Sequence, residues 1–140
     1  MGQPEGGQFM PYAINDCGQI IGSYAPYNED GDWNGESYPA CWRYGKLTLL
    51  ETFGQQGGVV AINNCGEILG YFKNKLNAIE HLVLWRPGRP PLLVDQSISK
   101  SFKLDSYYLL SGMNDAGQII CNGFLDGQYD YFLLQPRYRR

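Results

Sequence analysis

The feature that most constrains this chain is a short stretch that occurs three times. The copies are AINDCGQIIGSY at residues 13–24, AINNCGEILGYF at residues 61–72 and GMNDAGQIICNG at residues 112–123. The shared asparagine recurs about every 50 residues, a period typical of repeat arrays and propeller blades. The 140 residues are therefore predicted to form a single repeat domain, with units at approximately residues 8–58, 59–108 and 109–140.

Each copy carries the same turn signal between two apolar runs. An asparagine favours the first position of a type I turn, and a following glycine can adopt the left-handed conformation that closes a β-hairpin. The 18 glycines and 14% aromatic residues also favour strands joined by tight turns. We expect an all-β fold of three repeats with about four antiparallel strands each. The predicted structural turn residues are Asn15, Gly18, Asn63, Gly66, Asn114 and Gly117.

Several short motifs of this chain, and their order along the sequence, resemble the HAF repeat, an extracellular repeat family of bacterial proteins. The matching segments are AIN with GQIIG at residues 13–22, AIN with GEILG at residues 61–70, and HLVLW at residues 81–85. The chain departs from the family pattern at PACW (residues 39–42), at YFLL (residues 131–134) and at Cys121. The resemblance implies β-propeller-like blades, a location outside the cell and no catalytic residues.

Three four-stranded units are too few for a propeller in one chain, because known propellers have about four to eight blades. The third unit also lacks a fourth strand after YDYFLLQP (residues 129–136), so we expect an open sheet edge that residues 7–10 or a second chain covers. Two chains joined head to tail would supply six blades, which makes a homo-oligomer, and a dimer in particular, the leading expectation. A monomeric β-prism or β-trefoil with pseudo-three-fold symmetry is the alternative.

Only the first unit has a long polar insertion, at residues 25–38, and this insertion is unusually aromatic. Aromatic rings beside carboxylates and amides suit a contact with a glycan or a protein, because rings bury a large area and amides fix orientation. The candidate ligand-binding residues are Trp33, Tyr27, Tyr38, Asp32 and Asn34.

The same insertion begins like a calcium loop. Asp30, Asp32 and Asn34 alternate as the first ligands of such a loop do. The ninth and twelfth positions, however, hold Tyr38 and Cys41, where carboxylates would be needed. A solvated acidic loop is the preferred interpretation, and we expect neither a metal nor a cofactor.

The residues offer little for acid-base or nucleophilic catalysis. His81 is the only histidine, and the side chain of its neighbour Glu80 should point to the opposite face of a strand, so the two should not form a dyad. The serines lack a G-x-S-x-G context, and the sequence brings no two of the 14 acidic residues together. We expect a non-enzymatic binding or protein-interaction module. The alternatives are a carbohydrate-binding module, a small carboxylate-dependent hydrolase and a structural spacer from a larger array.

The charge and the hydropathy of the chain narrow the classes of partner that we expect. A formal net charge of −3 argues against nucleic acid, and no apolar run approaches the ~18 residues of a membrane span. The first residues, MGQPEGGQFM, lack the regions of a signal peptide, so the compartment stays open.

Cys17 and Cys65 share one turn position in two units and should lie too far apart for a disulfide, whereas Cys41 and Cys121 should pack as small apolar residues.

Overall fold

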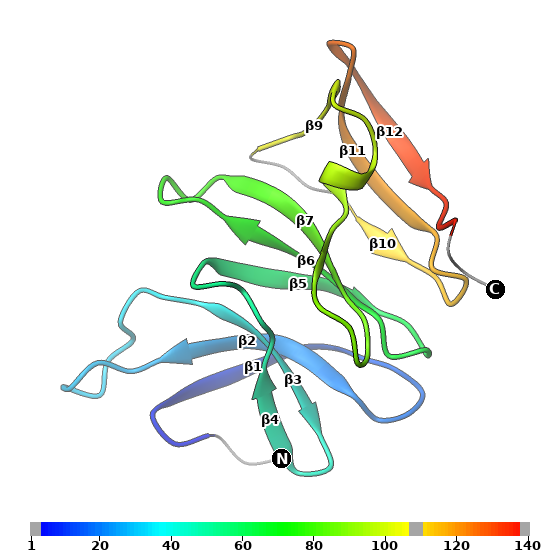
Figure 1. Ribbon diagram of the computed structural model, residues 1–140. Coiled ribbons are helices and arrows are strands. Elements are labelled where there is room, and N and C mark those ends of the chain that lie inside the picture. The colour runs from blue at the N-terminus through cyan, green and yellow to red at the C-terminus, as the bar shows by residue number, and fades with distance from the viewer. Residues whose placement is uncertain (1–3, 107–110, 138–140) are drawn as a thin grey trace.

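The structure of the protein is a computed structural model that describes residues 4–106 and 111–137, and it contains three antiparallel sheets (Figure 1). The first sheet consists of β1 (Gly7–Ile14), β2 (Ile20–Pro26), β3 (Tyr38–Arg43) and β4 (Lys46–Leu49). The second consists of β5 (Gln56–Ile62), β6 (Ile68–Lys73), β7 (Ile79–Trp85) and β8 (Leu92–Leu93). The third consists of β9 (Phe102–Leu104), β10 (Gly112–Met113), β11 (Ile119–Leu125) and β12 (Gln128–Leu134). The prediction of an all-β fold is confirmed.

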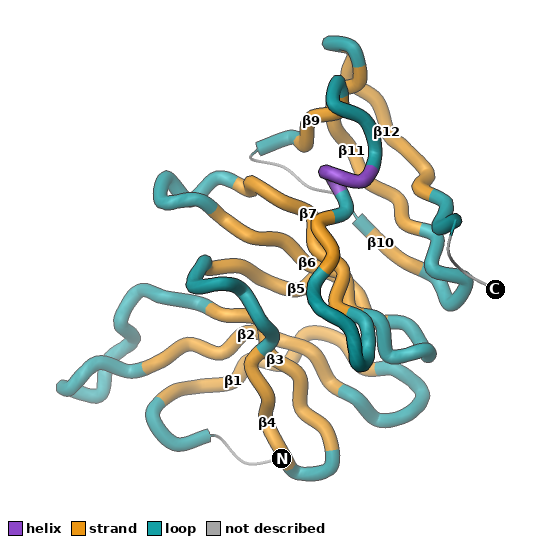
Figure 2. The backbone as a smooth tube through the Cα atoms, in the orientation of Figure 1, coloured by secondary structure: helices purple, strands orange, loops and turns teal. Residues whose placement is uncertain are grey.

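The three sheets follow one another in chain order like the leaves of a fan, and neighbouring sheets pack face to face (Figure 1). The described connections between strands are loops, apart from one short helical segment (Figure 2). A short 3-10 helix, η1 (Asp95–Ser97), follows β8. Among the described residues, no helix has the length and apolar character needed to cross a membrane.

The first strand of the third sheet is interrupted. β9 and β10 pair with two different parts of the same edge of β11, so together they take the place that β1 and β5 have in the other sheets. β1 and β5 each have a register shift in their middle, between Pro11 and Ala13 and between Val59 and Ala61. The break in the third sheet falls where the other two strands bulge, because a bulge already leaves a residue unpaired and so tolerates an insertion.

The predicted unit boundaries are consequently too late. Residues 102–104 were expected at the end of the second unit, but as β9 they belong to the third sheet. β5 begins at Gln56, inside the segment expected to close the first unit. Residues 7–10, one candidate to cover the open edge of the third unit, lie in β1 and pair with β2. This expectation is wrong, because the amino-terminal segment completes its own sheet.

The open edge itself is present. Within the described residues, β12 pairs with β11 alone, and the third sheet has no counterpart of β4 or β8 on that side. Unpaired main-chain groups along β12 are therefore available to water or to another chain.

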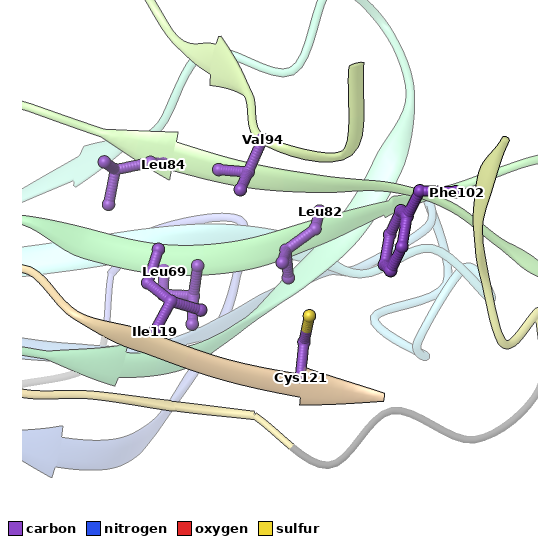
Figure 3. Close-up of a cluster of buried hydrophobic side chains, with 7 residues drawn as sticks. All are labelled: Leu69, Leu82, Leu84, Val94, Phe102, Ile119 and Cys121. Carbon is purple, nitrogen blue, oxygen red and sulfur yellow. The ribbon is translucent and has the colours of Figure 1, made fainter. Parts of the chain in front are cut away.

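Two apolar cores hold the sheets together, one at each joint between neighbouring sheets. The first joint, between the first and second sheets, buries Ile21, Cys41, Ile68, Phe72, Val83 and Trp85. The second joint, between the second and third sheets, buries Leu69, Leu82, Leu84, Val94, Phe102, Ile119 and Cys121 (Figure 3). The second sheet thus contributes one face to each joint, because side chains alternate between the two faces along most of β6 and β7.

The repeated asparagine turns form a hydrogen-bonded ladder that crosses both joints. Within the first turn, Asn15 Oδ1 accepts hydrogen bonds from the backbone N–H groups of Cys17 and Gln19, at 3.1 and 2.9 Å. Its amide Nδ2 donates to the carbonyl oxygen of Asn63 at 3.1 Å, and Asn63 Nδ2 donates in the same way to the carbonyl oxygen of Asn114 at 3.1 Å. Gly18, Gly66 and Gly117 have φ values of 80°, 81° and 78°, a conformation that glycine adopts without strain. The ladder fixes the spacing of the three repeats.

Candidate functional site

The insertion of the first unit forms an ordered loop between β2 and β3 that projects from the first sheet (Figure 2). At its tip, Asn28 Oδ1 accepts hydrogen bonds from the backbone N–H groups of Asp30 and Asp32, at 2.9 and 3.0 Å. An isolated β-bridge joins Tyr27 to Trp33 across the loop. The exposed fraction of Trp33 is 59% and that of Tyr27 is 42%. The loop therefore presents two large rings on a backbone held by its own hydrogen bonds.

Glu36 organises the base of this loop. Its backbone carbonyl oxygen accepts a 2.6 Å hydrogen bond from Trp33 Nε1, and its carboxylate accepts hydrogen bonds from Asn34 Nδ2, at 2.8 Å, and from the Tyr38 hydroxyl. The hydrogen bond to Glu36, together with burial, raises the pKa of Tyr38. Because Trp33 uses its only donor internally, the part of Trp33 that remains for a ligand is the face of its ring.

The loop gives little support to the calcium ligands considered above. Asn34 Oδ1 accepts the backbone N–H of Glu36 at 2.8 Å, so the amide of Asn34 is already engaged on both sides. Asp30 and Asp32 lie exposed on the loop. Nowhere in residues 4–106 or 111–137 do three His, Cys, Asp or Glu side chains gather in a way that could hold a metal ion.

A polar cleft of about 350 Å³ lies beside the base of the loop, between the first and second sheets. Glu36 and Tyr38 line one side, while Lys73, Lys75 and Glu80 line the other. The loop is tied to the second sheet here, because the carbonyl oxygen of Ser37 accepts a hydrogen bond from the Gly57 N–H at 3.4 Å. Of the predicted residues, Tyr38 lines this cleft together with two lysines that the sequence did not indicate. Trp33 and Asn34 are connected to it through their hydrogen bonds to Glu36.

The surroundings of His81 differ from the prediction. His81 Nε2 lies 3.6 Å from Glu80 Oε1, although strand alternation was expected to separate the two side chains. The reason is a register shift in which Phe72 pairs with His81 and Lys73 pairs with Ile79, so Glu80 is a bulged residue and does not alternate. The expectation that strand alternation separates these two side chains is wrong, because the bulge removes the alternation at Glu80.

His81 has a stronger partner that the sequence did not indicate. His81 Nδ1 lies 3.0 Å from Asp95 Oδ2, and Asp95 Oδ1 accepts a hydrogen bond from the Leu82 N–H at 2.9 Å. Asp95 therefore holds η1 against β7. No serine hydroxyl or thiol in the described part of the chain hydrogen-bonds to His81, so the arrangement is explained as a structural tie.

A hollow of about 690 Å³ lies between the second and third sheets. Its walls are apolar and include Leu92 and Leu134, and its rim carries Arg89 and Arg137. It occupies the side on which the third sheet lacks a fourth strand. Of the residues predicted from the sequence, the turn glycine Gly117 lines it, whereas none of the candidate ligand-binding residues does.

All four cysteines are free thiols. Cys17 and Cys65 are exposed in their turns, and Cys65 Sγ lies 3.6 Å from the carbonyl oxygen of Asp115. Burial raises the pKa of Cys41, and it raises that of Cys121 to about 11. The two buried thiols pack in the cores of the joints and stay protonated near neutral pH.

Comparison with family models, curated proteins and solved structures finds no match to this chain. The resemblance to the HAF repeat accordingly stays a prediction that rests on the motifs in the sequence.

Proposed function

We propose that the chain is a non-enzymatic binding module of the HAF-repeat type, in which the loop between β2 and β3 contacts a protein. The single observation that supports this proposal most is the exposure of Trp33, at 59%, on a loop that internal hydrogen bonds hold in place. An exposed ring on a pre-ordered loop binds with a smaller loss of conformational entropy than a ring on a mobile loop.

A carbohydrate ligand is the second candidate, and the state of the Trp33 ring favours it. The indole N–H is used by Glu36, so the ring offers a stacking surface rather than a donor. Asp32, which precedes Trp33 in the chain, is also exposed. The cleft beside the base of the loop adds lysines and a carboxylate that could hydrogen-bond to hydroxyl groups. Stacking combined with polar contacts is a usual way to fix a sugar ring or a polar peptide.

The proposed module also assembles as a homo-oligomer with propeller-like blades. The fan of three face-to-face sheets supports this arrangement, and two chains joined head to tail would bring the number of sheets to six. The apolar side chains exposed on the outer faces of the first and third sheets, including Leu49 and Leu133, support it as well.

The role of the loop in binding is tested on a glycan array and on a panel of immobilised extracellular proteins. The binding of the wild type is compared there with that of Trp33→Ala. We expect the substitution to abolish binding, or to weaken it at least tenfold, without change in the melting temperature. Tyr44→Asn is the matched control, because Tyr44 is also an exposed aromatic residue and its φ of 50° is one that asparagine tolerates. Unchanged binding by Trp33→Ala would contradict the proposal.

A further inference from the structure

The two joints use matched positions of the repeat. In the first sheet, Ile21 pairs with Cys41 across β2 and β3, and both side chains are buried in the first joint. The corresponding pair in the second sheet, Leu69 and Leu84, is buried in the second joint. We call the sheet face that carries this pair the forward face, since in the first and second sheets it meets the next sheet along the chain.

The forward face of the third sheet has no sheet against it. Its corresponding pair is Ile120 and Leu133, which pair across β11 and β12 and are 57% and 63% exposed. The equivalent residues Ile21 and Leu69 are both 0% exposed. Tyr131, on the same face, is 64% exposed. Side chains at these positions are thus core residues in two repeats and surface residues in the third.

The opposite face of the first sheet, which we call the reverse face, shows the same contrast. In the second sheet, Ile62 and Leu93 on the reverse face pack against the core of the first joint. Their counterparts in the first sheet are Ile14 and Leu49, which are 65% and 51% exposed. The two outermost faces of the described sheets are therefore both apolar and exposed. One is a forward face and the other is a reverse face, and inside the molecule these two kinds of face pack on each other.

The asparagine ladder also ends in complementary groups. In the described residues, Asn114 Nδ2 donates only to Gln118, and the backbone N–H of Asp115 has no acceptor, although the equivalent groups of the first two turns donate to the next turn. At the other end, and again among the described residues, the carbonyl oxygen of Asn15 accepts a hydrogen bond only from Gly18, whereas those of Asn63 and Asn114 also accept from the preceding turn. Donors are left over at the third turn and an acceptor at the first.

We propose that the forward face of the third sheet in one copy of this chain packs on the reverse face of the first sheet in a second copy, and that two such joints close a two-copy ring. In each joint Asn114 Nδ2 donates to the carbonyl oxygen of the partner's Asn15, which extends the ladder by one step. The occupant is a second copy, because both halves of the joint are present in one chain and repeat an interface that the chain already makes twice. A contact between two different faces of this kind is heterologous, and it gives a ring when its rotation closes.

One feature makes the joint between copies weaker than the internal ones. Inside the chain, each carboxylate of the ladder meets an amide: Asn64 Nδ2 donates to Asp16 at 2.9 Å and to Asp115 at 3.1 Å. Between copies, Asp115 would lie beside the partner's Asp16, and two carboxylates repel each other. Association is therefore expected to be concentration-dependent.

The inference deepens the assembly part of the proposed function, and it is tested independently of the loop. Sedimentation velocity and light scattering of the full chain compare the wild type with Leu133→Asp on the forward face and Leu49→Asp on the reverse face. Leu76→Asp is the matched control, since Leu76 is 83% exposed in the loop between β6 and β7 and lies on neither face. All three positions are exposed, so circular dichroism should show an unchanged fold.

We expect the wild type and Leu76→Asp to be dimers. Each face variant should have a dimer dissociation constant at least tenfold higher than that of the wild type. An equimolar mixture of Leu133→Asp and Leu49→Asp should recover a dimer, because one copy keeps an intact reverse face and the other an intact forward face. A monomeric wild type, a larger assembly, or a mixture that stays monomeric would overturn the proposal. Continued dimerisation of either face variant alone would also overturn it, as it would indicate a symmetric contact. Trp33→Ala should leave the assembly unchanged, so failure of ligand binding and failure of assembly are distinguishable.

Discussion

The side-chain amide of Asn15 donates a hydrogen bond of 3.1 Å to the carbonyl oxygen of Asn63, 48 residues further along the chain. The same bond recurs between Asn63 and Asn114, at 3.1 Å and a separation of 51 residues. The asparagine that closes each hairpin thus also sets the distance to the next sheet. A local turn signal and a long-range contact are carried by one side chain.

Asn63, the middle member of the ladder, should contribute most to stability. It is 3% exposed, and it accepts hydrogen bonds from the N–H groups of Cys65 and Glu67 while it donates to Asn114. Asn63→Ala leaves these buried groups without partners, so we expect a loss of about 2–4 kcal/mol in the free energy of unfolding. Asn114→Ala, at an exposed turn, should cost less than about 1.5 kcal/mol. Urea denaturation measures both, and equal losses would contradict the role given to the ladder.

Gly70 is required by close contacts in the first joint. A Cβ atom at this position would lie 2.2 Å from the carbonyl oxygen of Gly58 and 2.6 Å from the ring of Trp85. We expect Gly70→Ala to destabilise the fold by at least about 2 kcal/mol, because both the backbone and the ring would have to move. Gly112→Ala is the control, since its nearest neighbour would be a side-chain atom of Ile120 at 3.6 Å. Thermal unfolding should show a much larger drop in Tm for Gly70→Ala; similar drops would refute the packing argument.

The four thiols should divide into two classes. Cys17 and Cys65 are exposed, whereas Cys41 and Cys121 are buried and their pKa values are raised by burial. Iodoacetamide at neutral pH should modify Cys17 and Cys65 in the native protein and all four thiols in denaturant, as mass spectrometry would show. Since the pKa of Cys121 rises from 9.0 to about 11 on folding, its contribution to stability is complete below pH 9 and is lost as the pH rises toward 11. Rapid native modification of Cys121 would contradict its burial.

The hairpins and the open edge of the third sheet could be predicted because their signals are local. Asn15 and Gly18 lie in one turn, and within the described residues no alternating stretch like that of β4 follows β12. The unit boundaries could not be placed, because nothing in residues 102–104 distinguishes a strand of the third sheet from the end of the second unit.

The parts of the candidate site that depend on strand register or on contacts between repeats could not be predicted from the sequence either. Glu80 approaches His81 only because a bulge breaks the alternation, and Asp95 reaches His81 from η1, which follows β8. Lys73 lines the cleft beside Tyr38 because the first joint brings two repeats together. The loop residues Trp33 and Tyr27 were identifiable because an insertion present in one repeat alone stands out against the other two.

In the proposed ring, the end faces of two copies join as the internal sheets of one copy do. The substitution Asp115→Asn tests this claim most directly. Inside the chain the ladder alternates Asp16, Asn64 and Asp115, so an asparagine at position 115 would place an amide beside the partner's Asp16, as Asn64 lies beside Asp115. Sedimentation equilibrium should show a dimer dissociation constant about threefold to tenfold lower for Asp115→Asn than for the wild type, which corresponds to roughly 0.7–1.4 kcal/mol. Asp126→Asn, in the turn between β11 and β12, removes the same charge away from the ladder and should leave the constant unchanged. Equal dissociation constants for the wild type and Asp115→Asn would contradict the claim.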